Sequence, residues 1–141
     1  MFNPQNTITM SKTIDFNVFL VQWNPESIGY TKKTTFWDDF SIAEVFGKDD
    51  PNKGIEAVKD TYRRAFDEWK SNAEYITELS LVMNHKCWYF YDVANKVSDP
   101  QLKSYADELS HLYADLYYKV DNWCLDHLKG ADAEYYFRVT D

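Results

Sequence analysis

The stretch SNAEYITELSLVMNHKCWYFYDVANKVSDP, residues 71–100, decides the fold. Its apolar side chains recur every three or four residues, which is the spacing of one face of an α-helix. The residues on this face are Ile76, Leu79, Met83, Cys87, Phe90 and Ala94. Ser71 and Glu74 have the spacing of a capping box, and Asp99-Pro100 suits the cap and first residue of another helix. The pattern predicts one long helix and a second helix directly after it.

The segments on either side of this stretch carry the same periodicity. We expect the central helix over residues 72–97, an earlier amphipathic helix over 55–70 and a later one over 100–129. Gly130 is expected to end the last of these, because glycine readily takes the left-handed conformation found after helices.

Closer to the N-terminus, the segments with a recognisable helix or loop pattern are shorter. The sequence DDFSIAEVFG predicts a short helix capped by Asp38 or Asp39, with Gly47 in a left-handed conformation at its end. The sequence KDDPNKG, residues 48–54, is typical of a loop.

The length of 141 residues fits one domain, and only four glycines and four prolines favour helices over many short strands. We therefore expect an all-α fold, a small antiparallel helical bundle with three main helices and short N-terminal helices. Residues 1–12 should form a flexible N-terminus and residues 13–141 a single helical domain, although residues 15–23 fit a helix or a strand. We expect Tyr136 or Phe137 to dock the tail.

The charge of the chain excludes several classes of function. The formal net charge is -8, so the broad basic surface of a nucleic-acid-binding protein is absent and no direct nucleic-acid binding is expected. No apolar run approaches the roughly 20 residues that span a bilayer, and no secretory signal is evident, so no membrane partner is expected. With only two cysteines, we expect a cytoplasmic protein.

Histidine and cysteine do not form a metal-binding pattern. His85 and Cys87 point about 200° apart on a helix, so they cannot bind one metal ion together. Cys124 and His127 share a helix face, but a structural zinc site needs about four ligands. We expect both cysteines to act as small core residues.

Other motifs for catalysis or cofactor binding are incomplete. A calcium loop starting at Asp49 would place Pro51 and Lys53 where the ligands belong. Di-iron bundles use Glu-x-x-His twice, and the chain has it once, at Glu108 and His111. Phosphate loops and nucleophile elbows are absent from the sequence. We therefore expect no catalytic residue, no metal and no cofactor.

The aromatic content is high, with five Trp, eleven Tyr and nine Phe. These rings can fill a helix core that is buried on two sides, or they can form an interface, and the sequence leaves both readings open. Residues 99–141 contain nine acidic and four basic side chains, which fits either a solvated acidic face or a surface for a basic partner. On an ideal helix its acidic residues form a stripe, beside which tyrosines lie. We expect a partner-binding surface at Glu108, Asp115, Tyr118, Asp126, Tyr135 and Tyr136.

Four sequences carry a resemblance to known proteins: FWDDFSIAEVFG, DTYRRAFDEWKSN, ELSLVMNHKCW and LKGADAEYYFRVTD. Together they resemble a family of small uncharacterised proteins from gut bacteria and their phages or mobile elements. The resemblance implies a setting in which small acidic proteins block host defence complexes. It supplies no catalytic residues.

The function expected from the sequence is a non-enzymatic protein-binding modulator or inhibitor, with a protein partner that has a basic surface. The resemblance extends this to a phage-encoded counter-defence protein acting on a host nucleic-acid-handling complex. A homo-oligomeric structural or assembly protein is the first alternative, and a small-molecule-binding helical bundle is the second.

Overall fold

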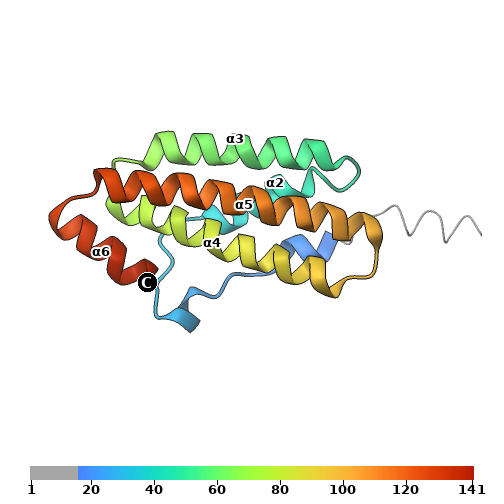
Figure 1. The fold of residues 1–141 in the computed structure, drawn as a ribbon, viewed down its shortest axis with the longest axis horizontal. Helices are drawn as coiled ribbons and strands as arrows, with labels where there is room; N and C mark the ends of the chain where they lie inside the picture. Colours follow the sequence, from blue (N-terminus) through green and yellow to red (C-terminus); the bar gives the residue numbers. More distant parts are fainter. Residues whose placement is uncertain (1–15) are drawn as a thin grey trace, which may run out of the picture.

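The computed structural model describes residues 16–141, and every regular element within them is helical, which confirms the all-α prediction (Figure 1). Among the described residues, two short 3-10 helices precede five α-helices. The elements are η1 (Phe16–Leu20), η2 (Pro25–Ile28), α2 (Phe36–Val45), α3 (Pro51–Trp69), α4 (Ala73–Lys96), α5 (Pro100–His127) and α6 (Gly130–Thr140). The expected flexible N-terminus, residues 1–12, lies outside the described residues.

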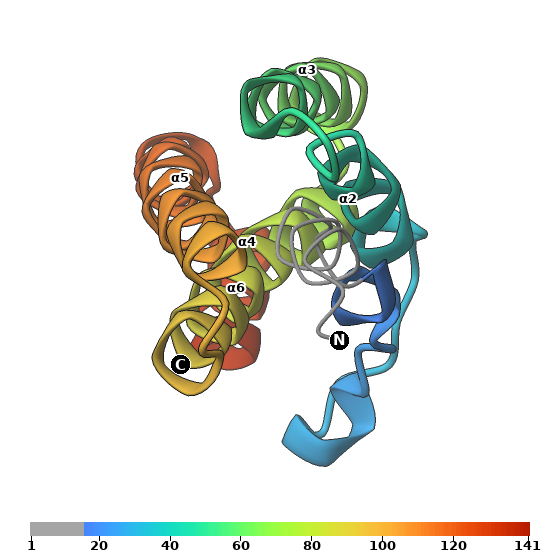
Figure 2. The same cartoon turned by 90° about the vertical axis from the view of Figure 1, so that its right-hand side faces the viewer.

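Helix α4 occupies the middle of the molecule, with α2 and α3 on one side and α5 and α6 on the other (Figure 2). In its N-terminal half the side chains are buried around the whole circumference, because the consecutive residues 76–83 are all buried. Most of the aromatic residues lie in the C-terminal half of α4, which is buried on one face only. Of the aromatic residues of α4, Phe90 is buried and Tyr75 and Tyr89 are half-buried, whereas Trp88 and Tyr91 are exposed. Both readings of the aromatic surplus, core and interface, therefore stay open for this helix.

Capping side chains set where the long helices begin. Asp99 caps α5 through the backbone N–H groups of Gln101 and Leu102, as predicted. The predicted Ser71 cap of α4 is wrong, because Asn72 accepts the N–H of Tyr75 instead at 3.1 Å. Asparagine is as good an N-cap as serine and lies one residue closer to the helix.

Helix α3 begins earlier than expected, so the predicted loop over residues 48–54 is wrong in its second half. Asp50 accepts the N–H of Asn52 at 3.1 Å, and Pro51 is the first helical residue. This is the same Asp-Pro start that the sequence correctly indicated for α5.

Two glycines, Gly47 and Gly54, allow close packing where the chain passes from α2 into α3. Gly47 does not have the positive φ predicted for it, and Gly54 lies inside α3. A Cβ atom built on either residue collides with the Tyr105 side chain, whose hydroxyl donates to the backbone carbonyl of Glu44 at 2.6 Å. Neither position therefore has room for a larger side chain.

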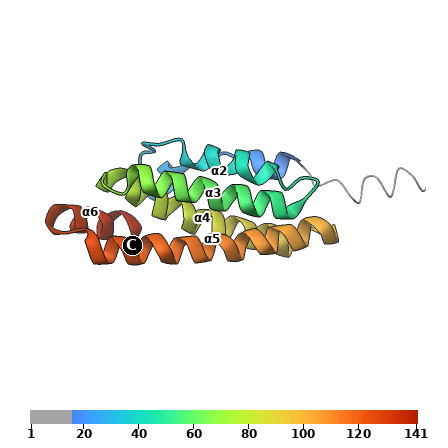
Figure 3. The same ribbon diagram turned by 90° about the horizontal axis from the view of Figure 1, so that it is seen from above.

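The C-terminal tail forms α6, which the sequence did not predict. The predicted end of α5 at Gly130 is too late, because α5 ends at His127 and Leu128 and Lys129 are extended. Gly130 does have a positive φ, 56°, but it is the first residue of α6. Figures 1 and 3 show α6 folded back from the end of α5. Tyr136 is 2% exposed and docks the helix, whereas Phe137 is 49% exposed.

Candidate functional site

The predicted partner surface is only partly assembled in the structure. Glu108, Asp115, Asp126 and Tyr118 are exposed on α5, as that prediction requires. Tyr135 is half-buried on α6.

Tyr136 must be removed from the predicted surface, because its ring lies in the core. Its hydroxyl donates to Asp121 and lies 2.9 Å from the Ser80 hydroxyl oxygen. Two tyrosines at adjacent positions of a helix point about 100° apart, so only one of them docks.

Asp115 and Tyr118 line a hollow of about 630 Å³ between α3 and α5. Its apolar part consists of Tyr62, Phe66, Leu112 and Leu116. The charged residues of its lining are Lys59, Arg63, Lys119, Asp67 and Asp115. Three basic groups therefore face two acidic ones, and this hollow does not attract a basic partner as the predicted stripe would.

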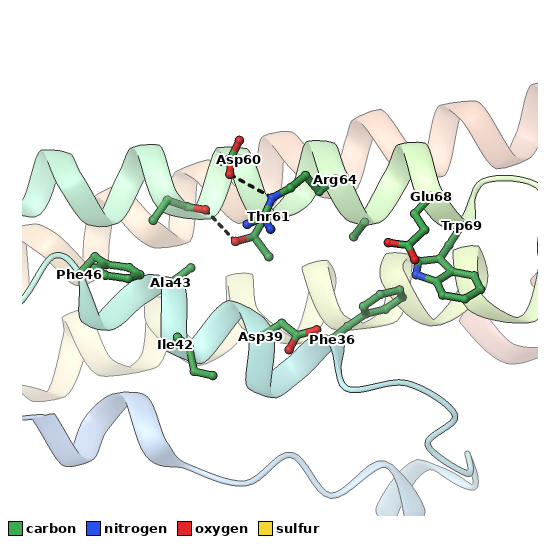
Figure 4. Close-up of a pocket in the computed structure, with 12 residues that line it drawn as sticks. Phe36, Asp39, Ile42, Ala43, Phe46, Asp60, Thr61, Arg64, Glu68 and Trp69 are labelled. Atoms are coloured by element: carbon green, nitrogen blue, oxygen red, sulfur yellow. Dashed lines mark hydrogen bonds and ion pairs between the residues drawn. The ribbon is translucent and has the colours of Figure 1, made fainter.

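A second hollow, of about 460 Å³, runs between α2 and α3, and we call it the α2–α3 groove (Figure 4). On one side it is lined by α2 and the residue that follows it, through Phe36, Asp39, Ile42, Ala43 and Phe46. The α3 side chains are Ala57, Asp60, Thr61, Arg64, Ala65, Glu68 and Trp69.

The edge of α2 along this groove is apolar and exposed. Ile42 and Phe46 lie four residues apart, and each is 62% exposed. Residues four apart lie on the same face of a helix, so the two side chains form one continuous edge. Beneath them the lining is made of buried or half-buried Phe36, Ala43 and Ala57. The groove thus has an apolar floor and one apolar wall open to water.

The rim of the groove is mainly acidic. Arg64 is its only basic lining residue, and its Nε lies 3.0 Å from Asp60 Oδ2. A hydrogen bond from Arg63, 2.7 Å away, is the main cause of the lowered pKa of Asp60. Asp39 and Glu68 add two further carboxylates, so the lining carries three acidic groups and one basic group.

Three alanines, Ala43, Ala57 and Ala65, are among the residues that line the groove. The buried residues of α3 are Gly54, Val58 and Ala65, so this helix packs through short side chains. Its larger apolar residues, such as Phe66 and Trp69, are half-buried. Short side chains bring helix backbones together at single points and leave hollows beside those points.

A buried ion pair attaches α2 to α4. Lys86 Nζ lies 3.0 Å from Glu44 Oε2 and donates to Ser41 Oγ at 2.7 Å. Tyr113 donates to the same Glu44 carboxylate, and Lys86 Nζ is 4.1 Å from the centre of the Trp37 ring. Burial raises the pKa of the Glu44 carboxyl and lowers the pKa of the Lys86 ammonium.

A second buried carboxylate, Glu78, fixes the chain that leads into α2. It accepts hydrogen bonds from the Tyr30 hydroxyl at 2.9 Å and from the backbone N–H groups of Lys33 and Thr34 at 2.7 and 2.9 Å. Burial next to this carboxylate raises the pKa of the Tyr30 hydroxyl. Both ends of α2 are therefore tied to α4, which holds the groove wall in place.

Neither cysteine thiol is activated for nucleophilic attack. Burial raises the pKa of the Cys124 thiol to about 12 and also raises the pKa of the Cys87 thiol. A thiol in apolar surroundings is inert, because the thiolate is the nucleophile. Within residues 16–141, no three side chains of His, Cys, Asp or Glu come together as a metal site would require.

Comparison with known protein families, curated proteins and solved structures finds no match for this chain. In the part of the chain that the structure describes, no helix has the length and apolar character needed to cross a bilayer.

Proposed function

We propose that this protein is a non-enzymatic binding protein that modulates or inhibits a larger partner by holding a basic amphipathic helix of that partner in the α2–α3 groove. The observation that carries the proposal is the exposed pair Ile42 and Phe46 beside an acidic rim. A helix that docks in a groove buries apolar residues that recur every three or four positions. Ile42 and Phe46 of the groove are four residues apart, which matches that spacing.

The charges favour a basic partner. Asp39, Asp60 and Glu68 outnumber Arg64 around the groove, and the whole chain carries a net charge of -8. Complementary charge steers encounter and sets orientation, while the apolar anchors supply the buried area. The resemblance to small proteins of gut bacteria and phages favours a host nucleic-acid-handling complex as the partner, since such complexes present basic surfaces.

The test uses a defined probe, a 14-residue peptide of leucine and lysine with leucines at helical spacing. Its counterpart has glutamate in place of lysine. We expect the lysine peptide to shift the amide resonances of α2 and α3 in a titration, and the glutamate peptide to bind much more weakly. Equal binding of the two peptides would remove the charge argument.

Two matched double variants test whether the lysine peptide binds in the α2–α3 groove. The double variant Ile42→Ser with Phe46→Ser should weaken binding of the lysine peptide at least about tenfold, which corresponds to about 1.4 kcal/mol of binding free energy. Tyr118→Ser with Leu125→Ser removes two exposed apolar residues of α5 and should leave binding unchanged. If both double variants bind equally, the groove is not the site. Light scattering tests self-association. If the wild-type protein has twice the monomer mass and the Ile42/Phe46 variant has the monomer mass, the groove is a contact between two copies of this chain.

A further inference from the structure

A third hollow, of about 540 Å³, lies between residues 21–27 and α4, and we call it the aromatic pocket. Its lining consists of Val21, Gln22, Trp23, Asn24, Ser27, Trp37, His85, Trp88, Tyr89, Tyr91 and Asp92. Six of these residues carry aromatic rings, counting the imidazole of His85. This site is independent of the proposed partner helix, because apart from the largely buried Trp37 none of its residues lies on α2 or α3.

The inner wall of the pocket is a fixed stack of rings. The Trp23 ring lies 5.8 Å from the Trp37 ring in a stacked arrangement and 5.7 Å from the His85 ring. Trp37 is held in place by its indole N–H, which donates to the backbone carbonyl of Val21 at 2.7 Å. A wall that is ordered before a ligand arrives loses little entropy on binding.

The outer wall is exposed to water. Trp88 is 61% exposed and Tyr91 is 54% exposed, and their rings meet edge to face at 5.6 Å. Large rings left open to water next to a hollow mark a binding site more often than an isolated exposed side chain does. Both residues can be replaced without opening the core.

The rings and charges of the pocket favour a cation. The face of an aromatic ring is electron-rich and attracts positive charge, and tryptophan does so most strongly. One ring of this cluster already holds a cation in the core, since Lys86 Nζ lies 4.1 Å from the centre of the Trp37 ring. Asp92 is the only acidic residue of the lining, and burial lowers the pKa of His85, so the imidazole adds no positive charge at neutral pH.

Asp92 is available to a ligand at small cost. Its carboxylate lies 2.9 Å from Lys96 Nζ, with the two side chains 59% and 72% exposed. Exposed ion pairs four residues apart on a helix contribute little, so an incoming cation displaces only a weak contact.

We propose that the aromatic pocket binds a methylated ammonium group, with the rings of Trp23, Trp88 and Tyr91 around the methyl carbons and the Asp92 carboxylate as the counter-charge. A quaternary ammonium has no N–H that needs an acceptor, and its charge is spread over methyl groups that pack on ring faces. The pocket volume falls within the range of about 300–1,000 Å³ that is usual for small-molecule sites.

The first experiment compares choline with 3,3-dimethylbutan-1-ol, its uncharged counterpart of the same shape. Tryptophan fluorescence and NMR titration of the full chain should show saturable binding of choline with shifts at Trp23 and Trp88. The neutral alcohol should bind at least about fivefold more weakly, which is the contribution expected from ring–cation attraction. No saturation with choline, or equal binding of the alcohol, would overturn the proposal.

Substitutions at exposed positions then place the site. Trp88→Leu should weaken choline binding about fivefold or more, and Asp92→Asn should weaken it in the same direction. Lys96→Ala should strengthen it, because Asp92 then has no competing partner. Tyr118→Leu replaces an equally exposed ring on α5 and should have no effect. Unchanged binding in Trp88→Leu, with its circular dichroism intact, would also overturn the proposal.

A third arm identifies the source of the ammonium group. A short peptide with trimethyl-lysine is compared with the same peptide carrying unmodified lysine and with free choline. Tighter binding of the trimethylated peptide than of choline assigns the pocket to a modified protein, and the reverse order assigns it to a small metabolite or headgroup. Preference for unmodified lysine over both would contradict the methylated-ammonium proposal.

Discussion

The ammonium nitrogen of Lys86 on α4 lies 3.0 Å from the Oε2 atom of Glu44 on α2, and both side chains are almost completely shielded from water. The two residues are 42 positions apart, so the pair joins two layers of the molecule. Desolvation makes such a pair expensive to form and expensive to break on one side only. It specifies how α2 sits on α4, and it therefore controls the wall of the α2–α3 groove.

The first prediction concerns this pair. Lys86→Met should lower the free energy of unfolding by about 3–5 kcal/mol, because it leaves the Glu44 carboxylate buried without its counter-charge. Glu44→Leu combined with Lys86→Met should cost less than the sum of the two single changes by more than about 1 kcal/mol. Urea unfolding of the four proteins measures this coupling. Strictly additive losses would mean that the two charges do not stabilise one another.

Gly54→Ala should destabilise the protein even though alanine is the better helix former. Helix propensity alone would favour alanine by about 1 kcal/mol. The added methyl group, however, would collide with the Tyr105 hydroxyl and come within 2.8 Å of the Gly47 Cα atom. Overpacking of this kind costs about 1–3 kcal/mol. Thermal unfolding should show a lower Tm for Gly54→Ala, while Lys53→Ala at the exposed neighbouring position serves as the control.

The cysteines should behave as packing residues. Cys124→Ala should lower stability by about 1–3 kcal/mol, because it leaves a small cavity. Cys87→Ala should cost less, since that side chain is only half-buried. In native protein at pH 8, labelling of Cys124 by a thiol reagent should be slow, because its pKa of about 12 keeps it protonated. Rapid labelling of Cys124 without denaturant would contradict its burial.

Two charge-reversal variants separate the groove from the surface predicted on α5. Asp39→Lys with Glu68→Lys and Glu108→Lys with Asp115→Lys change the net charge equally, and each should alter folding by no more than about 1 kcal/mol. Binding of the leucine–lysine peptide at low salt should weaken much more in the first variant. If the second variant weakens it more, the partner surface lies on α5, as the sequence suggested.

Much of the fold was predictable from periodicity and capping. The span of α4 was placed within one residue at each end, and the Asp99-Pro100 start of α5 was correct. These signals are local, since a cap and a helix face are determined by residues within a few positions of each other. The tail was harder, because Gly130 has the properties of a helix end and gives no sign that another helix starts at the same residue.

The long-range polar contacts were not predictable. Lys86 lies inside an apolar run and Glu44 lies within the short α2, and nothing in either local sequence indicates the other. The same holds for Glu78, which resembles a surface carboxylate until residues 30–34 fold over it. The grooves depend on which helix packs through small residues, and that follows from the three-dimensional arrangement of α2 and α3 rather than from the pattern of either helix.

The connection between α4 and α5 is only three residues long, residues 97–99, and we expect this to influence the order in which the chain folds. Closing so short a loop costs little chain entropy, and the hairpin that results brings together residues that are near one another in sequence. We therefore expect the α4–α5 hairpin to form first, and substitutions at the contacts between these two helices should slow folding. The contact between Lys86 and Glu44 needs a much longer loop and forms after the nucleus. Weakening it should therefore speed unfolding while leaving the folding rate nearly unchanged.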